Sequence, residues 1–252
     1  MDQIKLGSWN LQNFAITTKK NINTVVETIL KFDLIALQEI RDEKGINLLA
    51  SKTGYSLWLS EPVGSSETTA HQTGKRKERY AFMWNNKIKS LQEPLLIKGN
   101  KHFVRSPAIG FFATDKFDFV FSTIHVVWGQ KRDREAELIS IKKVLKEMRN
   151  ICFLSQCNEK KESEKNIILC GDFNTNLNNE NEIDWFTCIK EGTVVKSGNC
   201  YDNFWISKET IEFLGAGVEK TIWSDHYPIY ANFSSGVDND NLEHINLNID
   251  IN

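Results

Sequence analysis

Polar side chains that could bind a metal ion or move a proton stand at the ends of several apolar segments of this sequence. They are Asn10, Glu39, His125, Asp172, Asn174, Asp202, Asp225 and His226. A single acid in such a place is ordinary, because strand ends are solvated. Six such ends in one chain favour a functional site, provided that the strands converge on one sheet edge and so bring these side chains together.

The types of these residues indicate a particular chemistry. Carboxylate and amide oxygens are the ligands that hard divalent cations such as Mg²⁺ prefer. Hydrolysis of a phosphoester needs a cation to offset the phosphate charge, a base for water and a proton donor for the leaving oxygen. Histidines with carboxylate partners suit proton transfer near neutral pH. The residue set therefore predicts a metal-assisted phosphodiesterase.

The elements that must position these residues are mostly strands. Alternating or continuous apolar runs predict strands over residues 4–11, 33–39, 54–60, 79–85, 88–97, 104–114, 117–126, 166–170, 200–206, 211–218 and 227–233. Helical spacing predicts a helix that Thr17 or Thr18 caps and that carries apolar residues from Ile22 to Leu30. Two further helices are expected over residues 44–52 and 131–149. This mixture predicts an α/β (α+β) fold of two packed sheets with helices outside.

Composition and charge narrow the class of protein. The chain has 252 residues, of which 40% are apolar and 25% charged, as in an ordinary globular domain. No apolar run approaches the roughly 20 residues that a membrane helix needs. The net charge of −2 argues against a general nucleic-acid coat protein, although local patches decide substrate binding. The first residues do not resemble a secretory signal, which predicts a cytoplasmic protein, with a processed secreted form as the alternative.

Five cysteines, an odd number, without a signal-like start predict reduced thiols. No Cys-x-x-Cys pair is present, which argues against a structural zinc site. Residues 1–233 are expected to form one domain, and residues 62–77 a polar surface loop. The tail, 234–252, contains four carboxylates and neither Lys nor Arg, so it is expected to be a solvated extension. Its alternating apolar residues also allow an edge strand or a partner-binding strand.

Four short motifs resemble the signature blocks of the endonuclease/exonuclease/phosphatase superfamily, and they occur in the family's order. They are Trp9-Asn10-Leu11-Gln12-Asn13, Leu37-Gln38-Glu39, Gly171-Asp172-Phe173-Asn174 and Ser224-Asp225-His226-Tyr227-Pro228. The pairing of the third motif with the fourth, about 50 residues later, makes the resemblance specific. It implies a four-layered α/β sandwich of two packed mixed β-sheets, with the active site at the sheet edges.

A second set of motifs resembles the deoxyribonuclease I-like nucleases within that superfamily. They are Gln38-Glu39-Ile40-Arg41-Asp42, Ser60-Glu61-Pro62-Val63-Gly64, Lys77-Glu78-Arg79-Tyr80, Val104-Arg105-Ser106-Pro107-Ala108 and Cys200-Tyr201-Asp202. Abasic-site endonucleases and lipid phosphatases usually lack this set. The resemblance implies an endonuclease that cuts DNA, preferably duplex, with little sequence specificity.

The resemblance also implies how the metal site is built. Glu39 would be the main metal ligand, with Asn10 and Asp225 nearby. Asp172 and Asn174 would orient the scissile phosphate or hold a second ion. The cofactor implied is Mg²⁺ or Mn²⁺.

Catalytic and DNA-binding roles follow from the same resemblance. His226 paired with Asp202, and His125 paired with Glu78, would serve the attacking water and the leaving oxygen, in an order that stays open. The implied DNA contacts are Arg41, Tyr80 and Arg105. Taken alone, Arg41 is more typical of a surface ion pair, and Tyr80 of a partly buried core side chain.

Two stretches depart from the pattern of the secreted relatives. Residues 96–104 contain no Asp, Glu or Cys, and residues 192–200 contain no carboxylate. Cys200 matches a disulfide position, but its expected partner is replaced by Asn176 or Leu177. These differences argue against the structural Ca²⁺ and the disulfides of those relatives.

The sequence therefore predicts a Mg²⁺- or Mn²⁺-dependent endodeoxyribonuclease that acts on DNA as a monomer, away from membranes. One alternative is an abasic-site endonuclease or a lipid or nucleotide phosphatase of the same superfamily. Another is an inactive binding module. The second is disfavoured, because every position expected for a metal ligand or a histidine is filled.

Overall fold

The protein is a sandwich of two mixed β-sheets, seen in a computed structural model. The structure describes residues 3–17, 21–64, 77–97, 103–148, 152–153, 162–177, 184–210, 212–221 and 223–236. Most of the predicted polar loop and of the tail lies outside these ranges. In the described residues, no helix is long and apolar enough to cross a membrane.

The first sheet has the strand order β14-β15-β1-β2-β4-β3. Its strands are β1 (Gln3–Phe14), β2 (Leu34–Ile40), β3 (Ser56–Leu59), β4 (Arg79–Trp84), β14 (Phe213–Val218) and β15 (Ile229–Ser234). β1 and β2 run parallel at the centre, and the remaining pairs are antiparallel.

The second sheet has the strand order β12-β13-β11-β8-β7-β5, and β6 also pairs with β7. Its strands are β5 (Lys89–Ser90), β6 (Leu95–Leu96), β7 (Ala108–Ala113), β8 (Asp118–His125), β11 (Ile167–Asp172), β12 (Trp185–Thr187) and β13 (Asp202–Ser207). Here β8 and β11 form the parallel pair. The short strands β9 (Cys152–Phe153) and β10 (Glu162–Ser163) pair separately.

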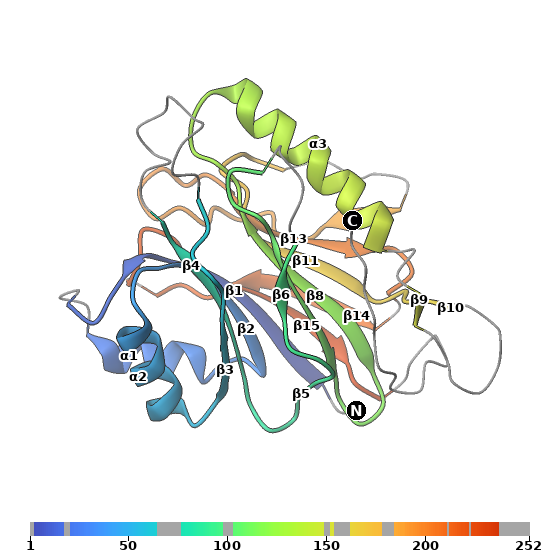
Figure 1. Cartoon of the computed structure of the whole chain (residues 1–252), viewed down its shortest axis with the longest axis horizontal. Coiled ribbons are helices and arrows are strands. Elements are labelled where there is room, and N and C mark those ends of the chain that lie inside the picture. Colours follow the sequence, from blue (N-terminus) through green and yellow to red (C-terminus); the bar gives the residue numbers. More distant parts are fainter. Residues whose placement is uncertain are drawn as a thin grey trace.

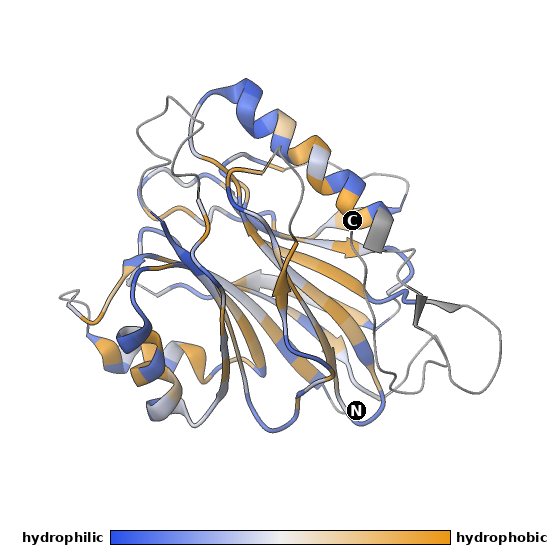
Figure 2. Ribbon diagram, viewed as in Figure 1, coloured by the Kyte–Doolittle hydropathy of each residue, from blue (hydrophilic) through white to orange (hydrophobic). Residues whose placement is uncertain are grey.

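Three apolar cores separate four layers. The core between the sheets contains Phe82 of β4, Phe121 of β8 and Ile168 of β11. A second core packs α1 (Ile22–Ile29) and α2 (Glu43–Thr53) against the first sheet, and a third packs α3 (Lys131–Met148) against the second. Figure 1 shows α1 and α2 on one side of the molecule and α3 on the other. Figure 2 shows apolar residues concentrated along the strands between them, so the predicted four-layered sandwich is confirmed.

Three predicted boundaries were wrong, each for a local reason. The first helix is capped by Asn21 and not by Thr17 or Thr18, because the Asn21 side chain accepts a hydrogen bond from the Asn23 N–H. The strand predicted over 88–97 is two short strands with Pro94 between them. The strand predicted over 104–114 begins only after Pro107, because proline has no N–H to donate to a ladder.

The two central parallel pairs decide where the polar strand ends lie. Asn10 of β1 is in register with Gln38 of β2, and His125 of β8 with Asp172 of β11. Parallel strands present their carboxyl ends at the same edge of a sheet. Contacts of β1 with β11 and of β2 with β8 bring the two sheets together there. The packing therefore gathers the polar ends of four strands into one place.

Candidate active site

Two histidine–carboxylate pairs form the centre of the site. His125 Nδ1 lies 2.7 Å from Glu78 Oε1, and His226 Nδ1 lies 2.6 Å from Asp202 Oδ2. All four side chains are buried. These are the two pairings that the family resemblance implied, and the fold brings both together from segments distant in the sequence.

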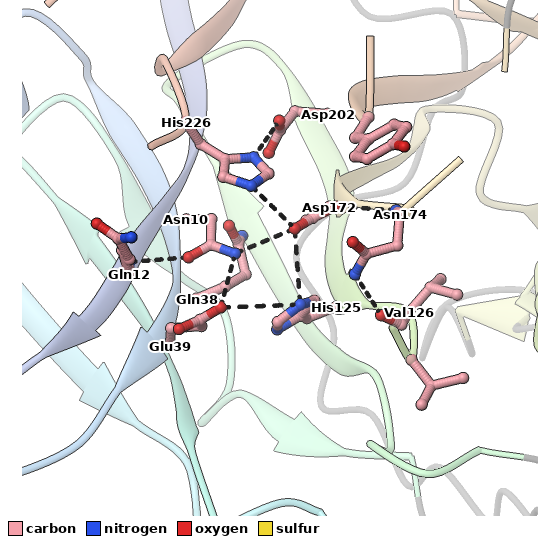
Figure 3. Close-up of polar contacts among 12 residues, drawn as sticks. Asn10, Gln12, Gln38, Glu39, His125, Val126, Asp172, Asn174, Asp202 and His226 are labelled. Atoms are coloured by element: carbon pink, nitrogen blue, oxygen red, sulfur yellow. Dashed lines mark hydrogen bonds and ion pairs between the residues drawn. The ribbon is translucent and has the colours of Figure 1, made fainter. Parts of the chain in front are cut away.

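Both imidazoles face Asp172. His125 Nε2 and His226 Nε2 each lie 3.6 Å from Asp172 Oδ2, and Figure 3 shows the two rings approaching this carboxylate from different directions. Since each Nδ1 is engaged by a carboxylate, each Nε2 is the atom available to a substrate. A phosphate bound beside Asp172 would have one imidazole for the attacking water and another for the leaving oxygen.

The surrounding charges favour protonated histidines. Burial would lower the pKa of His226, but the charges of Asp202 and Asp172 outweigh it and raise that pKa to about 10. Burial and Arg105 lower the pKa of His125, while Glu78 raises it and prevails. Burial would raise the pKa of Glu78, but His125 and Arg105 keep it below its usual value. A divalent cation in the site would oppose this protonation.

Asn10 joins two carboxylates at the base of the site. Its Nδ2 donates to Glu39 Oε1 at 3.2 Å and to Asp172 Oδ2 at 3.1 Å. Its Oδ1 accepts the Gln12 N–H at 2.9 Å, and Gln12 Nε2 donates to Asp225 Oδ2 at 2.9 Å. Asn10 thus connects three of the predicted metal-site acids, and in this arrangement it presents its nitrogen, not its oxygen, to Glu39 and Asp172.

The donor set fits a hard divalent cation. Glu39 and Asp172 place carboxylate oxygens around the same amide group, and Asp225 lines the same cavity. Two groups of acids and histidine could each surround an ion: Glu39, Glu78 and His125, and Asp172, Asp202 and His226. Since Glu78 and Asp202 are engaged by histidine Nδ1 atoms, Glu39, Asp172 and Asp225 remain the oxygen donors suited to Mg²⁺ or Mn²⁺.

Four residues at the site have a backbone conformation that non-glycine residues rarely adopt. They are Gln12 with φ 46°, Asn13 with φ 57°, Glu39 with φ 59° and Asn174 with φ 49°. Such conformations cost about 1–3 kcal/mol and persist where the surroundings enforce them. The Asn13 N–H donates to Glu39 Oε2 at 2.8 Å, while the Asn174 N–H donates to Asp172 Oδ1 and Asn174 Nδ2 to the Val126 carbonyl. The strained backbone turns the side chains of Glu39 and Asn174 toward the site.

The three residues predicted to contact DNA have different surroundings. Tyr80 is fully buried, and its hydroxyl accepts the His125 N–H at 3.0 Å. The prediction for Tyr80 was therefore wrong in this structure: a side chain inside the core cannot reach a ligand, and Tyr80 supports His125. Arg105 pairs with Glu78 Oε2 at 3.2 Å and donates to the His125 carbonyl, but still lines the cavity.

Arg41 also lines the cavity, and its guanidinium is already engaged. It donates to Asn13 Oδ1 and, at 2.6 Å, to the Lys77 carbonyl. Since the Asn13 N–H in turn holds Glu39, Arg41 is connected to the metal-site acid through one residue. Its contact with DNA remains a prediction.

Sequence reasoning missed several residues that hold the site. Gln38 Nε2 donates to Ser8 Oγ and Thr123 Oγ1 and so links the two sheets beneath the site. The Ser224 hydroxyl donates to the Asn10 carbonyl. Glu137 of α3 accepts the N–H groups of Val104 and Val127. Gln38 and Ser224 stand inside the quoted motifs, so those motifs could have identified them, but Glu137 lies on a helix with no local signal for such a contact.

One cavity of ≈ 590 Å³ is lined by all of the predicted site residues except Asn10, Tyr80 and Asp202. Its lining includes Asn13, Glu39, Arg41, Glu78, Arg105, His125, Trp128, Asp172, Asn174, Tyr201, Asp225 and His226. Most of these side chains are charged or polar. Such a lining suits an anionic substrate together with a cation, and not an apolar ligand.

Solved structures share the fold over nearly the whole chain. The catalytic domain of human Nocturnin with bound sulfate anion matches with a TM-score of 0.64 and 17% identity, over 92% of this chain and 93% of that one. A mannosyl-6-phosphatase from Bacteroides thetaiotaomicron matches with a TM-score of 0.61 and 16% identity, over 90% of this chain and 98% of the other. At these identities the likeness shows the common fold.

Sequence comparisons also find similar proteins over most of the chain. A protein named deoxyribonuclease from Thioalkalivibrio sp. (strain K90mix) is 25% identical over 274 residues, which cover 91% of this chain and 71% of the relative. The model of the Endonuclease/Exonuclease/phosphatase family matches residues 7–226, a range that contains both histidine–carboxylate pairs and the Glu39 cluster. With the fold, the site and the family model in agreement, this chain belongs to the endonuclease/exonuclease/phosphatase family.

Proposed function

We propose that this protein is a Mg²⁺- or Mn²⁺-dependent endonuclease that hydrolyses DNA with little sequence preference. The observation that carries the proposal is the convergence of two histidine–carboxylate pairs on Asp172, next to Glu39, in one open cavity. Hydrolysis of a phosphodiester needs a proton acceptor and a proton donor on opposite sides of phosphorus, and the paired imidazoles provide both.

Different residues bind the cation, transfer protons and position the catalytic groups. Glu39, with Asp172 and Asp225, would hold the cation, which offsets the charge of the phosphate when it is bound. His125 and His226 exchange protons with water and with the leaving oxygen through their Nε2 atoms. Glu78 and Asp202 hold the imidazoles in place through Nδ1, and Asn174 fixes the position of Asp172.

Two observations support DNA as the substrate. The relative that covers most of the chain is named deoxyribonuclease. Arg41 and Arg105 line the cavity, where their positive charges favour binding of a phosphate chain. A comparison of substrates is the decisive experiment.

Purified protein should be incubated with supercoiled plasmid, circular single-stranded DNA, RNA and an abasic duplex, each with Mg²⁺, with Mn²⁺ and with EDTA. The matched control is His226→Ala purified in parallel, which reports any contaminating nuclease. We expect the wild-type protein to cut plasmid and circular single-stranded DNA with either metal. The rate of cutting should be at least about 10²-fold lower for the variant, and no cutting should occur in EDTA. Cutting confined to the abasic duplex or to RNA, or no cutting of any of the DNA substrates, would contradict the proposal.

A further inference from the structure

The wall of the cavity carries an exposed tryptophan. Trp128 lines the cavity, and 52% of its surface is exposed. The other large apolar side chains exposed to this degree in the described ranges are Ile16, Leu30, Ile139 and Leu214, all aliphatic. Single exposed apolar residues are common, but this one is aromatic and shares a polar cavity with the histidine pairs.

The position of Trp128 is fixed from two directions. It lies three residues after His125, and the preceding residues are anchored, because the Val126 N–H donates to the Asp172 carbonyl at 2.8 Å and the Val127 N–H to Glu137 Oε2 at 2.7 Å. The backbone that leads to this ring is therefore held by β11 and by α3. A ring on such a backbone lies at a fixed distance from the phosphate site.

Two further planar groups adjoin the Trp128 ring. The Tyr201 ring lies 6.1 Å from it at an interplanar angle of 50°, and its hydroxyl accepts a hydrogen bond from Asn199 Nδ2 at 2.9 Å. The Arg134 guanidinium lies 5.9 Å from the Trp128 ring centre, within the range of a cation–π contact. Tyr201 directly precedes Asp202, the carboxylate partner of His226, so this aromatic pair is attached to the segment that carries His125 and to the segment that carries Asp202.

We propose that Trp128, together with Tyr201, forms a subsite that stacks one unpaired nucleobase of the substrate next to the scissile phosphate. This inference rests on the proposed nuclease function. A nucleotide joins a phosphate to a flat aromatic base, and the cavity likewise places a centre suited to phosphate next to a flat aromatic side chain. Stacking of a base on an aromatic side chain tolerates every base, because each has a π-face. The subsite therefore agrees with cleavage that has little sequence preference.

The subsite has a consequence for the choice of substrate. In a duplex both faces of each internal base are covered by its neighbours, so a base reaches Trp128 only where it is unpaired or turned out of the stack. Trp128 should consequently favour single-stranded DNA, strand ends or locally opened duplex over continuous duplex. Arg134, beside the ring, adds positive charge for the adjoining backbone.

The test compares two oligonucleotides with the same phosphate backbone. One is an octamer of thymidine, and the other is an octamer whose tetrahydrofuran sugars carry no base. Cleavage of both is measured with Mg²⁺ for the wild-type protein, Trp128→Ala, Trp128→Phe and the control Ile139→Ala, which removes an exposed side chain from α3. Thermal melting checks that every variant is folded.

We expect the wild type to cleave the thymidine octamer with a kcat/KM that is about 5- to 150-fold above that of the baseless octamer, the range that one stacked base provides. Trp128→Ala should lose most of this ratio through KM, with the baseless octamer cleaved as before. Trp128→Phe should retain part of the ratio, and Ile139→Ala all of it.

Several outcomes would overturn the inference, and they can be distinguished from one another. Equal cleavage of both octamers by the wild type, or an unchanged ratio in a folded Trp128→Ala, would leave a nuclease without this subsite. Cleavage of neither octamer, nor of plasmid, by the folded wild type would remove the nuclease function and the subsite with it. Equal loss on both octamers in Trp128→Ala would show a role in the structure of the phosphate site and not in base stacking.

Discussion

Asp172 is the residue at which the parts of the site meet. Its Oδ2 lies near both histidine Nε2 atoms and accepts the Asn10 amide, while its Oδ1 accepts the Asn174 N–H. Glu39 reaches the same place through Asn10 but has a more open side chain, so it is the acid best placed to meet a cation from solvent. Single substitutions can distinguish the contribution of these carboxylates from that of the histidine pairs.

Replacing Glu39 with Gln should abolish most activity without unfolding the protein. The amide keeps the shape of the side chain but removes the negative charge that binds a cation. We expect a loss of at least about 10²-fold in kcat/KM on plasmid DNA, the scale of losing one charge-stabilising group. The melting temperature in EDTA should stay close to that of the wild type. Near-normal cleavage would contradict the assignment of Glu39 to the metal site.

His226 should make stability depend on pH in a defined direction. The folded state holds its proton with a pKa of about 10, compared with 6.5 for an unperturbed histidine. Its stabilising contribution is therefore fully present below pH 6.5 and is lost as the pH rises toward 10. Urea unfolding in EDTA measures the free energy of unfolding of the wild type and of His226→Gln. The wild type should exceed the variant most at pH 6, and the difference should become smaller as the pH rises to 10. A difference that is constant with pH would show that packing alone stabilises His226.

At the scale of elements, the site depends on how closely β8 and β11 approach each other. Gly171 immediately precedes Asp172 and has φ 143°, and a Cβ there would lie 1.9 Å from the Ile124 carbonyl oxygen of β8. Only glycine allows this backbone approach. The approach sets Asp172 and His125 side by side at the ends of the parallel pair.

Gly171→Ala should destabilise the protein strongly. The new methyl group clashes with backbone and the torsion is strained, so we expect a loss of about 3 kcal/mol or more in the free energy of unfolding. Gly198→Ala is the matched control, because Gly198 has φ 69° but open space around its Cβ position, and we expect a loss of about 1–2 kcal/mol. Urea unfolding measures both. Equal losses in the two variants would show that the backbone torsion, and not the contact with β8, explains why glycine is required at position 171.

At the scale of the whole molecule, binding of a long nucleic acid must come from local charge, since the chain as a whole carries a net charge of −2. The sandwich places Arg41, from the end of the first sheet, and Arg105, from the segment before β7, in the wall of one cavity. Because these residues are far apart in the sequence, only the packing of the two sheets brings the two guanidinium groups into one cavity.

Arg41→Ala should weaken cleavage of duplex DNA while sparing a small activated phosphodiester. Only a long substrate reaches beyond the scissile phosphate, so only a long substrate should lose a contact. The slope of log kcat/KM against log salt concentration should fall by about 1. Arg41→Lys, which keeps the charge, is the control. Equal losses on both substrates would instead show that Arg41 acts through Asn13 on Glu39.

The sequence by itself determined the elements and the chemistry of the site. Apolar periodicity is a local property, so it identified all three helices of the described ranges and every strand there except the short strands β9, β10 and β12. The family resemblance of the motifs identified the acids and both histidine–carboxylate pairs. The misplaced boundaries lie beside Asn21, Pro94 and Pro107, where a cap or a missing N–H outweighs the apolar pattern.

Only the tertiary structure decided which polar ends meet and which side chains reach the cavity. Tyr80 stands in a motif that suggested DNA contact, yet the packing of the sheets buries it beneath His125. Trp128 and Glu137 gave no signal in the sequence, and the fold places one on the cavity wall and the other behind it. The physical reason is that burial and convergence depend on contacts between strands and helices far apart in the chain, which no local pattern of residues contains.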